Sequence, residues 1–178
     1  MGIKRILQNR RLSAVKRDQK ARFAPSGAIS VRTVGLVLYL EDNDQLTLLE
    51  KLCWLFFKRG AVCHVCIYIK NKALIKYQPP RKNDWLVLSK EHVNWYGVVR
   101  PGLSDAFFKQ SFDILINISP KYFFTTSFIA AKAQAKLKIG RYEWPHSPYQ
   151  LVLGCDQIIK DDDFISLLKK CLAYIKMA

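Results

Sequence analysis

Two almost continuous apolar runs constrain the fold of this chain more than any other feature. Residues 34–40 read VGLVLYL and residues 112–118 read FDILINI, so neither run has a polar face to turn toward water. Strands that are buried on both faces have this pattern, and they are typical of parallel sheets covered by helices on either side. We therefore predict that the two runs form the central strands of a parallel sheet.

Strand-like and helix-like patterns alternate along the rest of the chain. One helix is expected to start at a cap on Asn43 or Asp44 and to end at Gly60, and another to begin at Pro120 with Ser119 as its cap. The other expected strands cover 61–69, 85–88, 137–140 and 149–154, and the other expected helices cover 103–110 and 161–176. This alternation predicts right-handed βαβ units. The expected fold class is therefore α/β: a three-layer, Rossmann-like domain with a mostly parallel sheet of five or six strands.

The N-terminal segment is strongly basic. Residues 1–22 contain eight Lys and Arg residues and one acidic residue, Asp18. A thin apolar stripe at helical spacing runs through the segment, formed by Ile3, Ile6, Leu7, Ala14 and Val15. We predict a basic amphipathic helix within 1–24, followed by a single α/β domain over 25–178.

A helix of this kind needs a surface to hold it, because its cations repel one another and leave an isolated helix marginal in water. The alternatives are the domain's own surface, a second copy of the chain, and a bilayer with anionic headgroups. The stripe lacks the Trp and Phe anchors of membrane-surface helices. We predict protein–protein docking through Ile3, Ile6 and Leu7, which includes a homo-oligomer joined by this helix, with the cations facing outward.

The charge balance indicates an anionic partner, such as nucleic acid or an anionic surface. The chain has 29 Lys and Arg residues against 14 Asp and Glu, a net charge of +15, and a surplus of this size bears on partners. Aromatic side chains that can stack on bases lie near the basic segments, at Trp85, Trp95, Tyr96, Tyr142 and Trp144. The cations expected to face such a partner are Arg5, Arg10, Arg11, Lys16, Arg17, Arg81 and Lys82. The alternative is an ordinary solvated basic surface.

A second set of candidates follows from the topology of an open parallel sheet, in which ligands bind outside the carboxyl ends of the strands. Asp42 and Asp44 follow the first apolar run, in an acidic loop that would repel phosphate. Asn117, Ser119 and Lys121 follow the second run, where an expected helix N-terminus and a lysine can hold an anion. The alternative there is a plain helix cap.

Several strong signatures are missing from the sequence. It contains no P-loop, no G-x-G-x-x-G and no G-x-S-x-G, so no cofactor is expected. Cys63 and Cys66 have C-x-x-C spacing, but alternation along a strand places them on opposite faces, so no shared metal is expected. The odd number of cysteines, five, indicates reduced thiols and a cytoplasmic location. No apolar run is long enough for a transmembrane helix.

Two resemblances rest on residues 112–117 (FDILIN) and 130–140 (AAKAQAKLKIG). The chain resembles a family of uncharacterised Bacteroidota proteins of about this length, which share an Asn-aromatic-aromatic-Gly segment like 94–97. Over about thirty residues it is also similar to the N-terminal half-domain of heptosyltransferase-type GT-B glycosyltransferases. The second resemblance implies an enzyme in which Asp42 or Asp44 serves as general base opposite Asn117 and Ser119.

These observations support three functional hypotheses. The preferred one is a non-catalytic binding module for an anionic partner, either nucleic acid or a phosphorylated ligand. The next is a structural or interaction protein that uses its N-terminal helix on a protein or membrane surface. The third is an enzyme related to a half GT-B glycosyltransferase.

Overall fold

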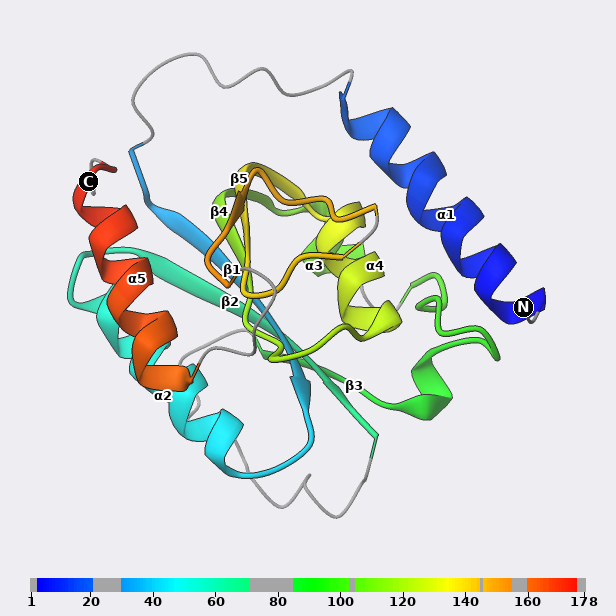
Figure 1. Ribbon diagram of the computed structural model, residues 1–178, viewed down its shortest axis with the longest axis horizontal. Helices are drawn as coiled ribbons and strands as arrows, with labels where there is room; N and C mark the ends of the chain where they lie inside the picture. The colour runs from blue at the N-terminus through cyan, green and yellow to red at the C-terminus, as the bar shows by residue number, and fades with distance from the viewer. Residues whose placement is uncertain are drawn as a thin grey trace.

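A six-stranded sheet forms the centre of the protein, and all its strands are parallel (Figure 1). The computed structural model describes residues 3–20, 30–70, 85–102, 105–144, 146–154 and 160–175, without the side chains of 16–20. The strands are β1 (Thr33–Leu40), β2 (Val62–Ile69), β3 (Trp85–Leu88), β4 (Ser111–Asn117), β5 (Gln134–Gly140) and β6 (Leu151–Val152). Their order is β3-β2-β1-β4-β5-β6, so the two apolar runs are the central strands, as the sequence predicts.

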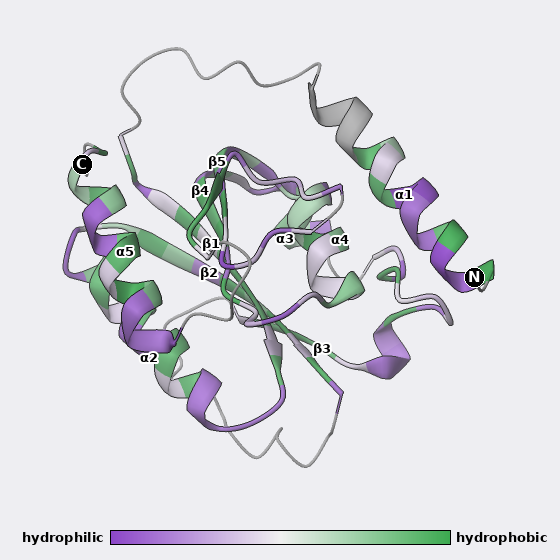
Figure 2. Cartoon of the chain, viewed as in Figure 1, coloured by the Kyte–Doolittle hydropathy of each residue, from purple (hydrophilic) through white to green (hydrophobic). Residues whose placement is uncertain are grey.

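Helices cover both faces of the sheet, which confirms the α/β, Rossmann-like class (Figure 1). They are α1 (Ile3–Lys20), α2 (Asp44–Phe57), α3 (Asp105–Lys109), α4 (Phe124–Lys132) and α5 (Asp161–Ala173), with a short 3-10 turn η2 (Lys90–His92). The core between the sheet and α2 and α5 includes Leu49 and Phe164. The core on the other face includes Phe108 of α3 and Ile129 of α4. Figure 2 shows the strands mainly in the hydrophobic colour, because both of their faces are covered.

The N-terminal helix α1 packs on the outside of α4 (Figure 1). Its anchor is Leu12, which is 1% exposed and contacts Phe124 and Phe128 of α4. Ile3 and Ile6, through which protein–protein docking is predicted, are 74% and 45% exposed and do not hold the helix on the domain. The domain's own surface holds α1 at Leu12, where this side chain meets the aromatic side chains of α4.

The helix after β4 begins later than predicted. Pro120 was expected as its first residue, but α4 starts at Phe124. The Ser119 hydroxyl is not a helix cap, because it accepts a hydrogen bond from the backbone N–H of Tyr39 (2.9 Å). The sequence pattern assigns the Ser119 side chain to a helix cap, but this side chain instead bonds to the neighbouring strand β1.

Smaller differences concern the C-terminal strands and helix. β5 starts at Gln134, three residues before the expected 137, and β6 is confined to Leu151–Val152. The last helix ends at Ala173. Cys63 and Cys66 lie on opposite faces of β2, in different core clusters, as strand alternation predicts. None of the described helices has the length and apolar character needed to cross a bilayer.

Candidate functional site

The carboxyl edge between β1 and β4 brings two predicted loops together. The Lys121 ammonium forms an ion pair with Glu41, with Nζ 2.7 Å from Oε2. Asp42 accepts a hydrogen bond from the backbone N–H of Gln45 at the start of α2 (3.2 Å). Asp44 is the exposed first residue of that helix. The charged candidates at this edge thus lie close in space, and two of them make contacts within the fold.

The polar candidates of the second loop are also engaged. The Asn117 amide donates to the Tyr149 hydroxyl (2.7 Å), and its carbonyl oxygen accepts from the backbone N–H of Ser119 (3.1 Å). The ring of Phe123 stacks on Tyr39 at the end of β1, with centroids 3.9 Å apart and planes 7° apart. The contact between Phe123 and Tyr39 joins the end of β1 to the segment after β4. The polar side chains at the centre of this edge therefore already have partners within the fold.

A hollow lies beside this edge, at the carboxyl ends of β2 and β3. It has a volume of about 580 Å³, and its walls come from α1, the turn after η2 and the start of α4. Tyr68 and Phe123 are part of its lining, so it adjoins the aromatic stack at the sheet edge. Its position agrees with the rule that open parallel sheets bind ligands outside the carboxyl ends of their strands.

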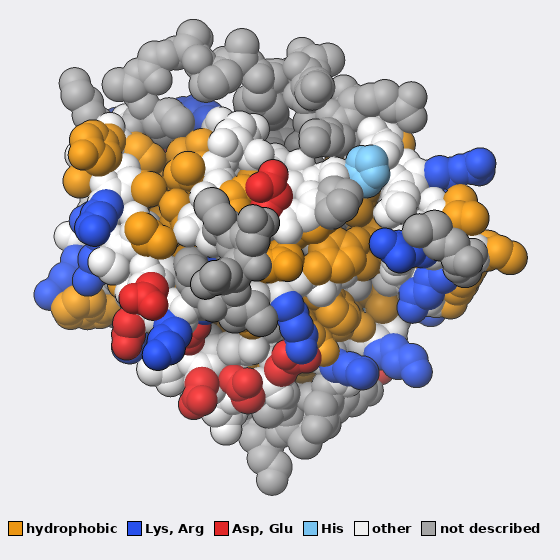
Figure 3. Space-filling model, viewed as in Figure 1, with side chains coloured by type: hydrophobic (Ala, Val, Ile, Leu, Met, Phe, Trp, Pro, Cys, Tyr) orange, Lys and Arg blue, Asp and Glu red, His pale blue; other side chains and the backbone are white. Residues whose placement is uncertain are grey.

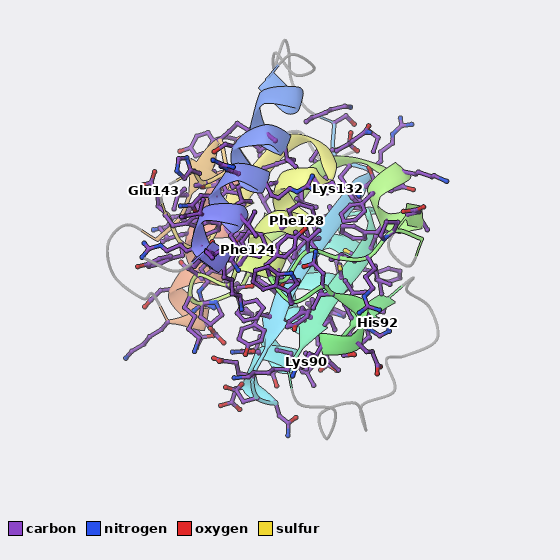
Figure 4. The ribbon with its side chains drawn as sticks, turned by 90° about the vertical axis from the view of Figure 1, so that its right-hand side faces the viewer. Lys90, His92, Phe124, Phe128, Lys132 and Glu143 are labelled. Carbon is purple, nitrogen blue, oxygen red and sulfur yellow. The ribbon has the colours of Figure 1, made fainter. Side chains whose placement is uncertain are left out.

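A second hollow of about 730 Å³ adjoins the first along α1. The two share Asn94, Tyr96 and Arg100 in their linings, and we call them together the basic groove. Figure 4 shows Lys90 and Lys132, which come from the two hollows, on the same flank of α1. The groove therefore follows one side of the N-terminal helix.

The lining of the basic groove is positively charged. Among the described residues, six cations from four parts of the chain line it: Lys4, Arg11, Lys70, Lys90, Arg100 and Lys132. No Asp or Glu is among its described lining residues. In Figure 3, Lys and Arg side chains lie with apolar ones along the right-hand side, near α1, whereas most visible carboxylates lie at the lower left. The local charge thus favours phosphate or another polyanion.

A tight turn presents aromatic rings to this groove. The side-chain oxygen of Asn94 accepts a hydrogen bond from the backbone N–H of Val98 (2.9 Å), and the N–H of Gly97 donates to the carbonyl of Asn94 (2.9 Å). Gly97 has φ 95°, a left-handed conformation that favours glycine. The turn leaves Trp95 65% exposed, edge-on to Tyr96 with centroids 5.2 Å apart.

The turn is fixed to the two helices that flank it. The Thr125 hydroxyl of α4 donates to the carbonyl of Gly97 (2.9 Å), and the Gln8 amide of α1 donates to the carbonyl of Tyr96 (2.8 Å). A Cβ at Gly97 would lie 3.0 Å from both the Phe124 ring and the Thr125 hydroxyl. The exposed Trp95 ring is therefore carried by a backbone that is held from both sides.

Of the predicted cations whose side chains the structure describes, one reaches this groove. Arg11 lines it, Arg5 lines a cleft on the opposite flank of α1, and Arg10 is exposed on the same helix. Arg81 and Lys82, and the side chains of Lys16 and Arg17, lie outside the described residues. The sequence does not predict that Lys90 and Arg100 line the groove, although both flank the Asn-aromatic-aromatic-Gly segment at 94–97.

Comparison with known proteins assigns the chain to a family but not to a function. Residues 3–175 match the model of the "Family of unknown function (DUF6913)". No curated protein and no solved structure matches the chain.

Proposed function

The chain belongs to the DUF6913 family of unknown function, and we propose that it is a non-catalytic binding module whose anionic partner is single-stranded nucleic acid. The observation that carries the proposal is the basic groove, in which six cations meet an exposed tryptophan without any carboxylate among the described lining residues. Cations neutralise phosphates, and aromatic rings stack on unpaired bases.

The exposed Trp95 ring favours a single strand over a duplex. Bases in a duplex are already stacked on one another, whereas an unpaired base offers its face to a protein ring. The two hollows lie end to end along α1 and share Arg100. A flexible strand can follow such a path, with phosphates on the cations of either wall.

The location that we propose for this activity is the cytoplasm. The described cysteines Cys53, Cys63, Cys66 and Cys171 carry free thiols, which is typical of proteins in a reducing compartment.

A second candidate function is supported by the outer face of α1. Ile3 and Ile6 are exposed there, and a second copy of the chain could cover them. We expect the substitutions Ile3→Ser and Ile6→Ser together to shift an oligomer toward monomer, measured by light scattering. A wild-type chain that is monomeric at every concentration would exclude this candidate.

The main proposal is tested by direct binding. Fluorescence anisotropy with a labelled single strand of about 12 nucleotides is expected to give saturable binding. The variant Lys90→Glu/Arg100→Glu is expected to bind at least about tenfold more weakly, because two phosphate contacts become repulsions. The control is Lys169→Glu/Lys170→Glu, which makes the same change of charge at two exposed positions of α5.

The control separates a specific groove from a general effect of net charge. If both double variants lose affinity equally, the binding follows total charge and the groove assignment is wrong. If the groove variant binds as well as the wild type, the assignment is also wrong.

A further inference from the structure

A separate cleft lies on the other flank of α1. It has a volume of about 580 Å³, and its principal lining residues are Lys4, Arg5, Tyr122, Tyr142, Glu143 and Trp144. We call it the aromatic cleft. Figure 4 shows Glu143 on the opposite side of α1 from Lys132, so the cleft and the basic groove flank the same helix. Its volume is within the range of small-molecule sites, which is about 300–1,000 Å³.

The aromatic wall of the cleft is held in place from below. The rings of Tyr122 and Trp144 lie with centroids 5.2 Å apart and planes at 60°. Trp144 packs edge-on against Tyr149, whose hydroxyl accepts the hydrogen bond from Asn117 at the end of β4. Tyr122 is 39% exposed. The cleft thus offers ring surface that is fixed by the edge of the sheet.

The polar groups of the cleft carry both signs of charge. Lys4 and Arg5 lie on the α1 wall, and the exposed carboxylate of Glu143 lies on the wall formed after β5. Burial raises the pKa of the Tyr122 hydroxyl, and the nearby positive charge of Arg5 opposes this rise. The cationic helix wall and the aromatic wall are therefore close enough to act on one ligand.

We propose that the aromatic cleft binds one nucleoside monophosphate unit. Its base stacks on Tyr122 and Trp144, since such rings are the usual platforms for unpaired bases. Its phosphate lies toward Lys4 and Arg5. The Glu143 carboxylate repels phosphate but accepts hydrogen bonds from base N–H groups, as acidic side chains do with the cytosine amine. Guanine offers two neighbouring N–H donors on one edge, so it suits the carboxylate best.

The unit has two sources, a free nucleotide or a nucleotide of a strand that lies in the basic groove. Lys4 and Gln8 line both the cleft and the groove, so the two sites meet at the N-terminal half of α1. A strand can cross there without leaving the cationic surface. This inference does not rest on the proposed function, because free nucleotide binding is measured without any strand.

The free nucleotide is tested by tryptophan fluorescence in the variant Trp95→Phe, which removes the aromatic reporter of the groove. Titration with guanosine monophosphate is expected to quench emission saturably, and uridine monophosphate to bind more weakly. Inorganic phosphate alone is expected to give no quenching. Glu143→Gln is expected to weaken the binding of guanosine monophosphate about tenfold, which is the discrimination given by one good base contact. The affinity for uridine monophosphate is expected to change less.

The strand is tested in the same variant with an oligonucleotide of about 12 nucleotides that contains guanine. Quenching that Trp144→Phe abolishes, while circular dichroism stays unchanged, supports occupation of the cleft. Trp144 packs on Tyr149, so its replacement could disturb the fold. Tyr142→Ser is a second variant that leaves the contact between Trp144 and Tyr149 intact, and it is expected to weaken the binding of both the free nucleotide and the strand.

The outcomes separate this inference from the proposed function. Lys90→Glu/Arg100→Glu is expected to weaken the binding of the strand and to leave the binding of guanosine monophosphate unchanged. Glu143→Gln is expected to weaken the binding of guanosine monophosphate. If neither guanosine monophosphate nor the guanine-containing strand quenches saturably, the assignment is wrong. It is also wrong if Glu143→Gln and Tyr142→Ser both bind guanosine monophosphate as tightly as their parent.

Discussion

Lys121 and Glu41 form an ion pair that joins the loops after the two central strands, with Nζ 2.7 Å from Oε2. This is the edge of the sheet at which the topology alone would place a ligand. The lysine expected to hold an anion there already has a carboxylate partner, and the helix expected to begin beside it starts only at Phe124. Lys70 and Lys90, which line one hollow of the basic groove, follow the carboxyl ends of the neighbouring strands β2 and β3.

The first prediction concerns this ion pair. Lys121→Ala is expected to leave the affinity for a single strand unchanged within about twofold, because the pair lies outside the basic groove. The free energy of unfolding is expected to change by less than about 1 kcal/mol, as for other exposed ion pairs. Anisotropy and urea denaturation measure the two quantities. A tenfold loss of affinity would contradict the basic groove and would indicate that the strand binds at the edge between β1 and β4.

The second prediction concerns the anchor of α1. Leu12→Ala is expected to detach the helix, because Leu12 is the most buried of its described side chains and Leu-to-Ala changes in cores cost about 2–5 kcal/mol. Hydrogen exchange is expected to show loss of protection in α1 with protection retained in the sheet. Strand affinity is expected to fall, since Lys4 and Arg11 then leave the groove. Ile6→Ala, at a position that is 45% exposed, is the matched control and is expected to change neither. Equal effects of the two substitutions would contradict the assigned anchor.

The third prediction concerns a buried lysine in β5. Burial lowers the pKa of Lys138 to about 7, and its ammonium donates to the carbonyl of Ala131 (2.9 Å). The unfolded chain holds this proton up to about pH 10.4. Between these pH values the unfolded state binds more protons, so this group makes the protein more stable as pH rises.

The measurement is urea denaturation at several pH values above 7, compared with Lys138→Met. Other groups titrate in this range, but they contribute equally to both proteins, so the difference isolates Lys138. The free energy of unfolding of the wild type is expected to rise, relative to that of the variant, by on the order of 3 kcal/mol across this pH interval. A constant difference would show that the pKa of Lys138 is not lowered in the folded protein.

The fourth prediction concerns Asp113, which ties the start of β1 to β4 and β5. Burial by itself raises the pKa of this carboxyl, but the Lys136 ammonium (2.7 Å) and the backbone N–H groups of Arg32 and Thr33 outweigh it and hold the pKa at about 2. The unfolded carboxyl takes up its proton near pH 3.9. The stabilisation is therefore present above about pH 5 and is lost as pH falls toward 2.

Asp113→Asn is expected to cost about 2 kcal/mol at pH 7 and much less at pH values near 2. Chemical denaturation across this range gives both values. A cost that is the same at both ends would mean that the carboxylate charge does not contribute.

The sequence was sufficient for the fold because its strongest signal is local. A strand buried on both faces must be apolar at neighbouring positions, and β1 and β4 satisfy this without reference to anything distant. The start of α4 was misplaced because Ser119 followed by Pro120 has the pattern of a helix cap. The competing contact is the backbone N–H of Tyr39, which lies 80 residues away in the chain.

The candidate site was less accessible to sequence reasoning, because its cations come from separate parts of the chain. Lys70 follows β2, Lys90 and Arg100 flank the turn that carries Trp95, and Lys132 ends α4. Lys4 and Arg11 join them only because α1 packs on α4, and the anchor of α1, Leu12, lies outside the apolar stripe that the sequence pattern suggested.

The salt dependence of strand binding tests the central claim most directly. If the six cations of the basic groove each neutralise a phosphate, the logarithm of the binding constant falls with the logarithm of salt concentration with a slope of about −4. In Lys90→Glu/Arg100→Glu the slope is expected to become shallower by about 1 to 2, while the control Lys169→Glu/Lys170→Glu keeps the wild-type slope. An unchanged slope in the groove variant, or a wild-type protein that binds no single strand at low salt, would contradict the account.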